Sequence, residues 1–385
     1  MATFEVSEKT RLFIEKYYPS VTLQDWSDWK WQLRHQIKTS AQLSRFLELS
    51  PDEILAFEKK DAFSFAITPY TMSLFTDDRQ DPFRRTLVTD LREWQSTDGE
   101  SEDPLGEEPY RPVKSIVHRY PDRALFFATG HCAVYCRYCT RARMVGDPEQ
   151  YRSELKAWEE GFQYIESHPE IRDVLITGGD PLTLSDEKLD FILSRLRSIS
   201  HVEFIRIGTK VPFVLPQRVT EELCQTLKKY HPLYLSLHVI HPREITQESR
   251  EACVRLADAG LPLGSQTVLL KGVNDQVEIL KNLMHSLLKI RVKPYYLFHC
   301  DPISGAAHFR TSVKKGIEMI EGLRGHTTGY AVPHYAIDMA GSGGKVTFVP
   351  DSILGREGSY LKVQNFRGET HFYRDGQDRD GQDHS

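Results

Sequence analysis

Apolar residues repeat at two different spacings along this chain, and the spacing changes near residue 124. Before about residue 75 they recur every three or four positions, which predicts helices over 11–18, 26–49 and 51–60. Ser50-Pro51-Asp52-Glu53 has the form of a capping box with proline at the first helical position. The tryptophans at 26, 29 and 31 are expected to pack between these helices.

From residue 124 onward, short apolar runs alternate with longer stretches of helical spacing. The predicted strands cover 124–129, 173–177, 203–207, 233–239, 265–270 and 294–298, with a strand-like stretch at 331–338. The predicted helices cover 151–167, 186–198, 219–230, 243–259, 275–290 and 311–323. After the first strand, the strands recur about every thirty residues, the period of one βα unit. Six such units predict an α/β fold, a partial (β/α)6 TIM-type barrel with its chemistry on the loops after the strands.

Two segments outside this alternation are strongly polar. Residues 76–119 are acidic and loop-rich, and we expect a solvated wrapping segment or linker there. The C-terminal sequence RDGQDRDGQDHS repeats the letters DGQD and is expected to be disordered.

Composition excludes several classes of protein. The 385 residues carry a net charge of -5, which gives no overall basic field for nucleic acid. We expect no signal peptide and no membrane span, because the first residues are polar and no apolar run is long enough. The six cysteines do not form a disulfide framework, and we expect a reducing, cytoplasmic location.

The densest chemistry lies in GHCAVYCRYCTRARMVG, residues 130–146, directly after the first predicted barrel strand. Cys132, Cys136 and Cys139 have C-x3-C-x2-C spacing, so three thiolates can hold three irons of a [4Fe–4S] cluster and leave the fourth iron open. Electron-transfer clusters use four cysteines, and a closed zinc site also has four ligands. The alternatives are a zinc site completed by His131, or three buried cysteines without a ligand.

Two glycine-rich turns also follow predicted strands. Gly178, Gly179 and Asp180 come after 173–177, where small residues let the backbone approach a ligand; alone, this is as consistent with a structural turn. Lys345 ends the sequence AGSGGK, and a lysine on a flexible turn can form an imine with pyridoxal phosphate (PLP). A phosphate-binding P-loop does not fit, because Val346 follows the lysine; a surface lysine after a turn remains the alternative.

Taken together, these motifs resemble the lysine 2,3-aminomutase family of PLP-dependent radical S-adenosylmethionine (SAM) enzymes. The resemblance runs from about residue 113 to about residue 372. The matching stretches are HRYPDRAL (118–125), CAVYCRYCTRAR (132–143), TGGDPL (177–182), RIGTKVPFVLPQR (206–218), GSQTVLLKGVND (264–275), KIRVKPYYLFHCD (289–301), HFRT (308–311), RGHTTGY (324–330) and GSGGK (341–345).

The resemblance implies a division of the chain into four regions. They are a helical N-terminal and wrapping region (1–112), a radical SAM barrel (113–325), a C-terminal segment carrying the PLP lysine (326–373) and a disordered tail (374–385).

The resemblance also implies a role for each matching residue. Cys132, Cys136 and Cys139 would hold the cluster, and Lys345 would bind PLP covalently and act in catalysis. The remaining residues would bind cofactors or substrate: Arg123 and Gln266 at PLP; Gly178, Gly179, Asp180 and His238 at SAM; Arg141 at the substrate α-carboxylate; and Asp301 and Asp338 at the distal ammonium of lysine. Without the resemblance, the single arginines, aspartates, His238 and Gln266 are equally typical of surface, capping or core positions.

The activity implied is the transfer of the amino group of L-lysine from C2 to C3, giving β-lysine, with a flavodoxin or ferredoxin as reductant. Two carboxylates at the distal end favour a basic side chain and disfavour glutamate. The alternatives are an aminomutase for arginine, ornithine or protein-bound lysine, a radical SAM epimerase, and a non-catalytic Fe–S or zinc protein.

The family also implies a homo-oligomer. Some of its members hold an interface zinc with additional cysteines. This chain has no cysteine after Cys300, so no interface zinc is expected.

Overall fold

A computed structural model describes residues 6–59, 63–95, 97–146 and 155–375, and its centre is a nine-stranded sheet in the order β1 to β9. The strands are β1 (Ile116–Tyr120), β2 (Arg123–Thr129), β3 (Asp173–Gly178), β4 (Phe204–Thr209), β5 (Leu233–His238), β6 (Leu263–Leu269), β7 (Lys293–His299), β8 (His334–Met339) and β9 (Gly344–Phe348). β2 to β8 are parallel, and β1 and β9 add antiparallel edges. The predicted partial α/β barrel is confirmed, and its six strands are β2 to β7.

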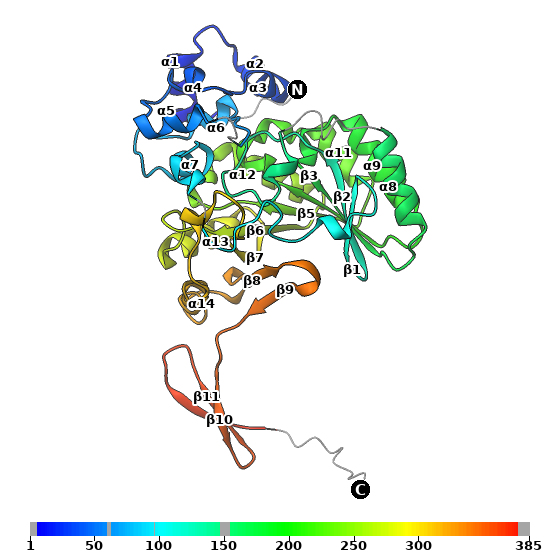
Figure 1. Ribbon diagram of the computed structural model, residues 1–385, viewed down its shortest axis with the longest axis vertical. Helices are drawn as coiled ribbons and strands as arrows, with labels where there is room; N and C mark the ends of the chain where they lie inside the picture. Colours follow the sequence, from blue (N-terminus) through cyan, green and yellow to red (C-terminus); the bar gives the residue numbers. More distant parts are fainter. Residues whose placement is uncertain (1–5, 60–62, 96, 147–154, 376–385) are drawn as a thin grey trace.

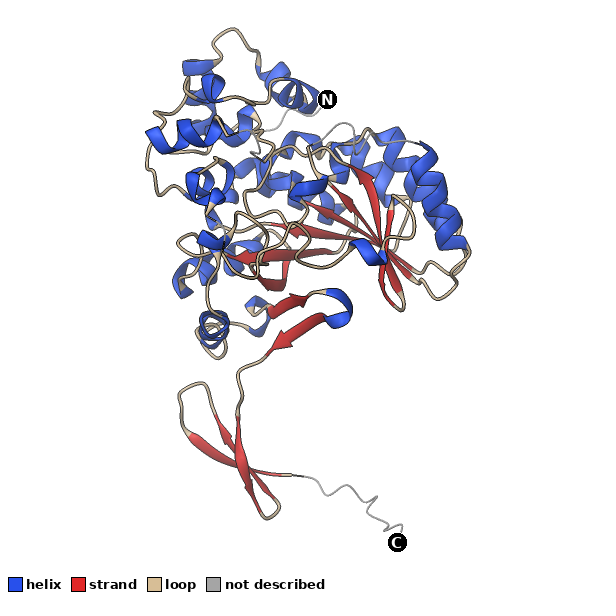
Figure 2. Ribbon diagram, viewed as in Figure 1, coloured by secondary structure: helices blue, strands red, loops and turns tan. Residues whose placement is uncertain are grey.

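Helices cover the outer side of the curved sheet (Figure 1; Figure 2). They are α8 (Leu155–Glu166), α9 (Asp186–Ser198), α11 (Glu221–Lys228), α12 (Gln247–Asp258), α13 (Val277–Lys289) and α14 (Val313–Glu321). The short helix α10 (Val211–Val214) instead follows β4, and its Val214 lines the cavity inside the barrel. The start of the helix predicted over 151–167 lies outside the described residues. Caps explain where two of the predicted helices begin later than expected. Thr220 accepts a hydrogen bond from the backbone of Leu223, so α11 begins at Glu221, and Thr246 caps α12 in the same way.

Alternation along the parallel strands separates the core from the barrel interior. Ile176, Ile207 and Leu237 are fully buried in the main hydrophobic cluster. On the same strands Thr177, Arg206, Ser236 and His238 line a central cavity. Successive strand residues point to opposite faces of the sheet, so the apolar set packs under the helices and the polar set faces inward. Each buried Leu or Ile stabilises the fold by about 1.5–3 kcal/mol, and the interior remains available for ligands.

Side chains hold the two edges of the sheet together. The backbone N–H of Lys345 on β9 donates to the Tyr120 hydroxyl on β1, at 2.9 Å. Arg119, the neighbour of Tyr120, donates to the carbonyl oxygens of Met339 and Gly341. The turn that carries Lys345 is therefore fixed against β1.

The N-terminal helices pack above one side of the barrel (Figure 1). They are α1 (Glu8–Tyr17), α2 (Leu23–Ser27), α3 (Trp29–Arg34), α4 (Ser40–Leu43), α5 (Pro51–Phe57) and α6 (Pro69–Ser73). The single helix predicted over 26–49 is wrong, because Asp28 and Thr39 each cap a new helix and Ile37 pairs with Ile67 as a β-bridge. Trp26 and Trp31 are buried together as predicted, with ring centroids 5.8 Å apart.

A solvated wrapping segment or linker was predicted at 76–119, and its solvation is wrong for much of that segment. It contains α7 (Pro82–Leu87) and the short helices η1 (Leu91–Trp94) and η2 (Glu108–Tyr110). Leu105 and Glu107 are buried and line the central cavity. The acidic residues of 103–108 form ion pairs with arginines of residues 130–146, which we call the cysteine loop. Acidity in this segment therefore does not mean exposure.

After β9 the chain leaves the barrel and forms a separate antiparallel sheet, which the sequence did not predict (Figure 1). Its strands are β10 (Ile353–Glu357), β11 (Tyr360–Gln364) and β12 (Thr370–Arg374). Arg374, expected in the disordered tail, is part of β12, and residues 376–385 lie outside the described residues. None of the described helices is long and apolar enough to cross a membrane.

Candidate functional site

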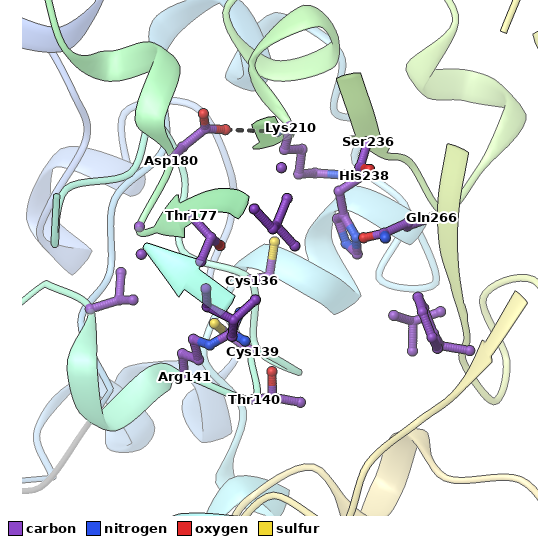
Figure 3. A pocket seen from close by; sticks show the side chains of 18 of the residues that line it. Cys136, Cys139, Thr140, Arg141, Thr177, Asp180, Lys210, Ser236, His238 and Gln266 are labelled. Atoms are coloured by element: carbon purple, nitrogen blue, oxygen red, sulfur yellow. Dashed lines mark hydrogen bonds between the residues drawn. The ribbon is translucent and has the colours of Figure 1, made fainter. Parts of the chain in front are cut away.

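A cavity of about 640 Å³ occupies the barrel interior and is lined by strand residues and by the loops after the strands. The sequence-predicted site residues all line it: Cys132, Cys136, Cys139, Arg123, Arg141, Gly178, Gly179, Asp180, His238, Gln266, Asp301, Asp338 and Lys345. Figure 3 shows Cys136, Cys139, Arg141, His238 and Gln266 around one space. Residues more than 200 positions apart in sequence are therefore brought to one chamber.

The cysteine loop follows β2 and is held from both sides. Gln36 donates to the carbonyl oxygens of Cys132 and Ala133, at 3.0 and 2.9 Å. Arg137 and Glu93 form an ion pair that is almost fully buried, and the Arg137 backbone N–H donates to Thr86. This loop conformation depends on the N-terminal region, which fixes the direction of the three thiols.

Burial raises the pKa of all three cysteine thiols. For Cys132 the pKa lies well above its usual range, because burial is reinforced by repulsion from Asp180 and the other two cysteines. The pKa of Cys136 is raised to about 11, chiefly by burial. Three buried thiolates that repel one another are unfavourable without a cation, and a positively charged iron cluster would offset that cost.

The three thiols are not arranged to bind one metal ion together. No group of three His, Cys, Asp or Glu side chains in the described ranges is arranged around one ion position. Thiolates of an iron–sulfur cluster bind separate irons, so they need not meet at one point. The donor set therefore fits a cluster better than the zinc alternative.

Close backbone contact explains the two glycines at the end of β3, Gly178 and Gly179. A Cβ at Gly178, where φ is +122°, would lie 2.3 Å from the Thr129 carbonyl oxygen. A Cβ at Gly179 would lie 2.4 Å from the His131 carbonyl oxygen. The glycines thus let the β3 loop lie against the cysteine loop, in addition to facing the cavity.

Asp180 connects three neighbouring segments of the site. Its carboxylate accepts hydrogen bonds from the Thr209 hydroxyl at 2.7 Å, from the Lys210 backbone at 2.7 Å, and from the backbones of Leu182 and Val211. Burial nevertheless raises its pKa. Its observed contacts orient the loops after β3 and β4.

His238 and Lys210 occupy the side of the cavity next to the cysteines. Nε2 of His238 lies 2.8 Å from the Tyr138 hydroxyl, in the cysteine loop. Burial, assisted by Lys210, lowers the pKa of His238 well below its usual range, so the ring is neutral. Lys210 forms an ion pair with buried Glu244. The sequence prediction missed Lys210, although its position directly after β4 is the signal that could have identified it.

The opposite side of the cavity holds Lys345 and two aspartates. Lys345 Nζ lies 2.9 Å from Asp338 Oδ2 and 5.2 Å from the Phe298 ring centroid. Asp338 Oδ1 is buried and has no hydrogen-bond partner in the part of the chain that the structure describes. Burial, and then repulsion from Asp338, raises the pKa of Asp301 to about 7, while Lys345 and Arg141 act to lower it. An arriving ammonium group would satisfy Oδ1 and reduce the repulsion between these two carboxyl groups.

Arg123 and Gln266 also line the cavity. The Arg123 guanidinium lies over the Tyr120 ring at 4.2 Å, and its nearest ion-pair partner, Asp122, is 3.7 Å away. Gln266 pairs in register with His238 of the adjacent strand. A loosely paired guanidinium beside Lys345 suits a phosphate group, because its donors match phosphate oxygens.

Arg141 follows the cysteine triplet and is tied to a residue that the sequence prediction missed. Arg141 Nη2 lies 2.8 Å from Glu107 Oε1, and Nε lies 3.3 Å from Glu107 Oε2. Both side chains line the cavity. No pattern in the sequence marks Glu107 among the acidic residues around it.

Comparison with known proteins shows which families share these features. Residues 127–283 match the radical SAM superfamily, and residues 320–384 match the family described as lysine-2,3-aminomutase. The L-lysine 2,3-aminomutase of Acetoanaerobium sticklandii is 47% identical over 92% of this chain and 86% of its own length. That of Bacillus subtilis is 46% identical over 91% and 75%. The glutamate 2,3-aminomutase of Clostridioides difficile is 42% identical over 91% and 83%.

Proposed function

Since this chain belongs to the lysine 2,3-aminomutase family of radical SAM enzymes, we propose that it converts L-lysine into β-lysine. Family membership makes it an isomerase that works with a [4Fe–4S] cluster, SAM and PLP. One observation carries the choice of lysine: two largely buried carboxyl groups, Asp301 and Asp338, face the cavity beside Lys345, and one oxygen of Asp338 has no hydrogen-bond partner among the described residues. Such a pair accepts a distal ammonium and repels the side-chain carboxylate of glutamate.

Each residue has a role in this proposal. Cys132, Cys136 and Cys139 hold the cluster, and Lys345 holds PLP with Arg123 and Gln266 beside it. Gly178, Gly179, Asp180 and His238 form the SAM side of the chamber. The bound cofactors supply a radical that takes a hydrogen atom from C3 and a carrier for the migrating amino group.

The chain's own side chains bind and orient the substrate between these cofactors. Arg141 grips the α-carboxylate, and Asp301 and Asp338 receive the distal ammonium. With both ends fixed, C2 and C3 lie between Lys345 and the cysteine loop. The walls of the chamber exclude water, which protects radical intermediates from side reactions.

Asp338 also binds the released side chain of Lys345 when substrate arrives. It pairs with the Lys345 ammonium in this structure, so it can receive the lysine side chain whenever Lys345 is released from PLP. The pair keeps Lys345 close to its cofactor position and supplies the charge balance for the amine.

We also propose a reducing, cytoplasmic setting and a one-electron reductant such as flavodoxin or ferredoxin. All six cysteines, each within the described ranges, are free thiols, which supports that setting.

The experiment that tests the proposed function compares amino acids under anaerobic conditions. The chain is supplied with iron, sulfide, SAM, PLP and a reductant, and then with L-lysine, L-arginine, L-ornithine or L-glutamate. Chromatography and mass spectrometry of the products should show β-lysine as the fastest product. A faster reaction of glutamate, or no reaction of lysine, contradicts the proposal.

A further inference from the structure

The segment 101–108 contributes Leu105 and Glu107 to the cavity wall and contacts the loop of Asp301 and the turn of Lys345. Ser101 donates its N–H to the Pro302 carbonyl at 2.9 Å and accepts from the Ser304 N–H at 3.1 Å, next to Asp301. The Leu105 carbonyl accepts from the Gly341 N–H at 3.0 Å, in the turn before Lys345. We call residues 101–108 the strap.

The strap lies close against the lysine turn because Gly106 has no side chain. A Cβ at Gly106, where φ is +61°, would lie 3.0 Å from the Gly341 backbone nitrogen. This contact sets the next residue, Glu107, at the cavity wall, where its side chain is only 6% exposed. The Glu107 backbone N–H is held by Asp103 Oδ1 at 3.0 Å.

Glu107 fixes one edge of the Arg141 guanidinium. The two hydrogen bonds use Nε and Nη2 of Arg141. Among the described residues, Nη1 has no hydrogen-bond partner. The guanidinium carbon lies 5.5 Å from the Phe127 ring centroid, which limits movement out of the plane. A paired carboxylate and a ring face together determine where the free edge of the arginine points.

We propose that Glu107 is a positioning residue that aims the free edge of Arg141 at the substrate α-carboxylate. The inference rests on the proposed function, in which Arg141 binds that carboxylate. Through the strap, Glu107 is also linked to the loop of Asp301 and the turn of Lys345. The strap thereby sets the distance between Arg141, at the carboxylate end of the substrate site, and Asp301, at the ammonium end. The strap is therefore a determinant of substrate length.

Direct binding measurements test this role. The ligands are L-lysine and L-lysinamide, which differ only in the α-carboxylate, and the readout is the change in PLP absorbance when an amine replaces Lys345. Glu107→Ala should weaken L-lysine binding about tenfold and change L-lysinamide binding less than about twofold. Glu107→Gln, which retains one acceptor oxygen, should recover part of the loss.

Glu108→Gln is the matched control. Glu108 is adjacent on the strap, pairs with Arg143 at 3.0 Å, has a half-exposed side chain, and does not line the cavity. This variant should bind both ligands as the parent protein does.

Three results for Glu107→Ala would overturn the inference. The first is unchanged binding of L-lysine. The second is tighter binding of L-lysine, which would mean that Glu107 competes with the substrate, and the third is an equal loss for both ligands, which would mean a general structural role. Arg141→Ala separates this inference from the proposed function. If Arg141→Ala weakens L-lysine selectively and Glu107→Ala does not, only the role of Glu107 is wrong. If Arg141→Ala has no effect, the carboxylate site itself is wrong.

Discussion

Lys345 and Asp338 face each other across the β8–β9 hairpin, where they are paired in register and their charged atoms are 2.9 Å apart. The proposed cofactor lysine and a proposed substrate-binding carboxylate are therefore neighbours on two antiparallel strands. The Tyr120 hydroxyl holds the Lys345 backbone from β1, so the hairpin cannot turn away from the cavity without breaking that bond.

Lys345→Ala should lower aminomutase turnover by about 1,000-fold or more, because no other residue is proposed to hold PLP covalently. The variant should also lack the visible absorbance of a PLP–lysine imine. Reductive cleavage of SAM should continue, since the three cysteines are unaffected. Normal turnover in this variant would refute the assignment of Lys345.

Replacing both substrate-pocket aspartates should impair lysine use. Asp301→Asn with Asp338→Asn should reduce kcat/KM for L-lysine by about 100-fold, because charged hydrogen bonds to the distal ammonium are lost. Steady-state kinetics measure the change. Asp258→Asn, at an exposed ion pair with Arg291, serves as the control and should behave as the parent protein does. Unchanged lysine kinetics in the double variant would eliminate the ammonium pocket.

Lysine affinity should depend on pH through Asp301. Burial raises the pKa of this carboxyl group to about 7, so it gains a proton as the pH falls through that value. A protonated carboxyl group attracts an ammonium less, and L-lysine binding should therefore weaken as the pH is lowered from about 8 to about 6.

Titrations at several pH values measure this dependence against L-norleucine, which lacks the distal ammonium. The ratio of the two affinities should change with pH in the parent protein and stay constant in Asp301→Asn. The same pH dependence in both proteins would exclude Asp301 as its source.

The buried Arg137–Glu93 pair should be important for stability and for cluster assembly. Both side chains are 1% exposed, so Glu93→Gln leaves a buried guanidinium without its charge partner. The free energy of unfolding should fall by about 3–5 kcal/mol, and iron content after reconstitution should fall with it.

Chemical denaturation compares this variant with Glu203→Gln, which removes a similar pair from the surface. Arg172 and Glu203 are 59% and 44% exposed, and their loss should cost less than about 1 kcal/mol. Equal effects of the two substitutions would show that burial of the Arg137–Glu93 pair is not important.

Regular strand patterns made most of the barrel predictable, whereas contacts between distant segments were not. The six parallel strands each carry a short apolar run with turn signals, and the structure confirms β2 to β7. The helix predicted over 26–49 was wrong because local caps at Asp28 and Thr39 outweighed the apolar spacing. The exposed β10–β12 sheet has too few buried residues to leave an apolar pattern.

The candidate site residues also include some that local sequence patterns predicted and some that depend on distant partners. Cysteine spacing and the glycine-lysine turn are local signals, and their residues line one cavity. Glu107 and Lys210 were missed because their importance depends on partners 34 residues away in each case, at Arg141 and Glu244. The acidic sequence suggested exposure for the strap, but Leu105 and Glu107 are buried in it, and Glu107 is paired with Arg141 of the cysteine loop.

In the proposed enzyme, one chamber brings the substrate, bound to PLP in place of Lys345, within reach of SAM at the cysteine loop. L-Lysine deuterated at C3 tests it directly, with mass spectrometry of SAM and 5′-deoxyadenosine after anaerobic turnover. Deuterium should appear in the adenosyl methylene of the parent protein and be absent from it in Lys345→Ala. Formation of β-lysine with no deuterium in the adenosyl group would contradict the shared chamber.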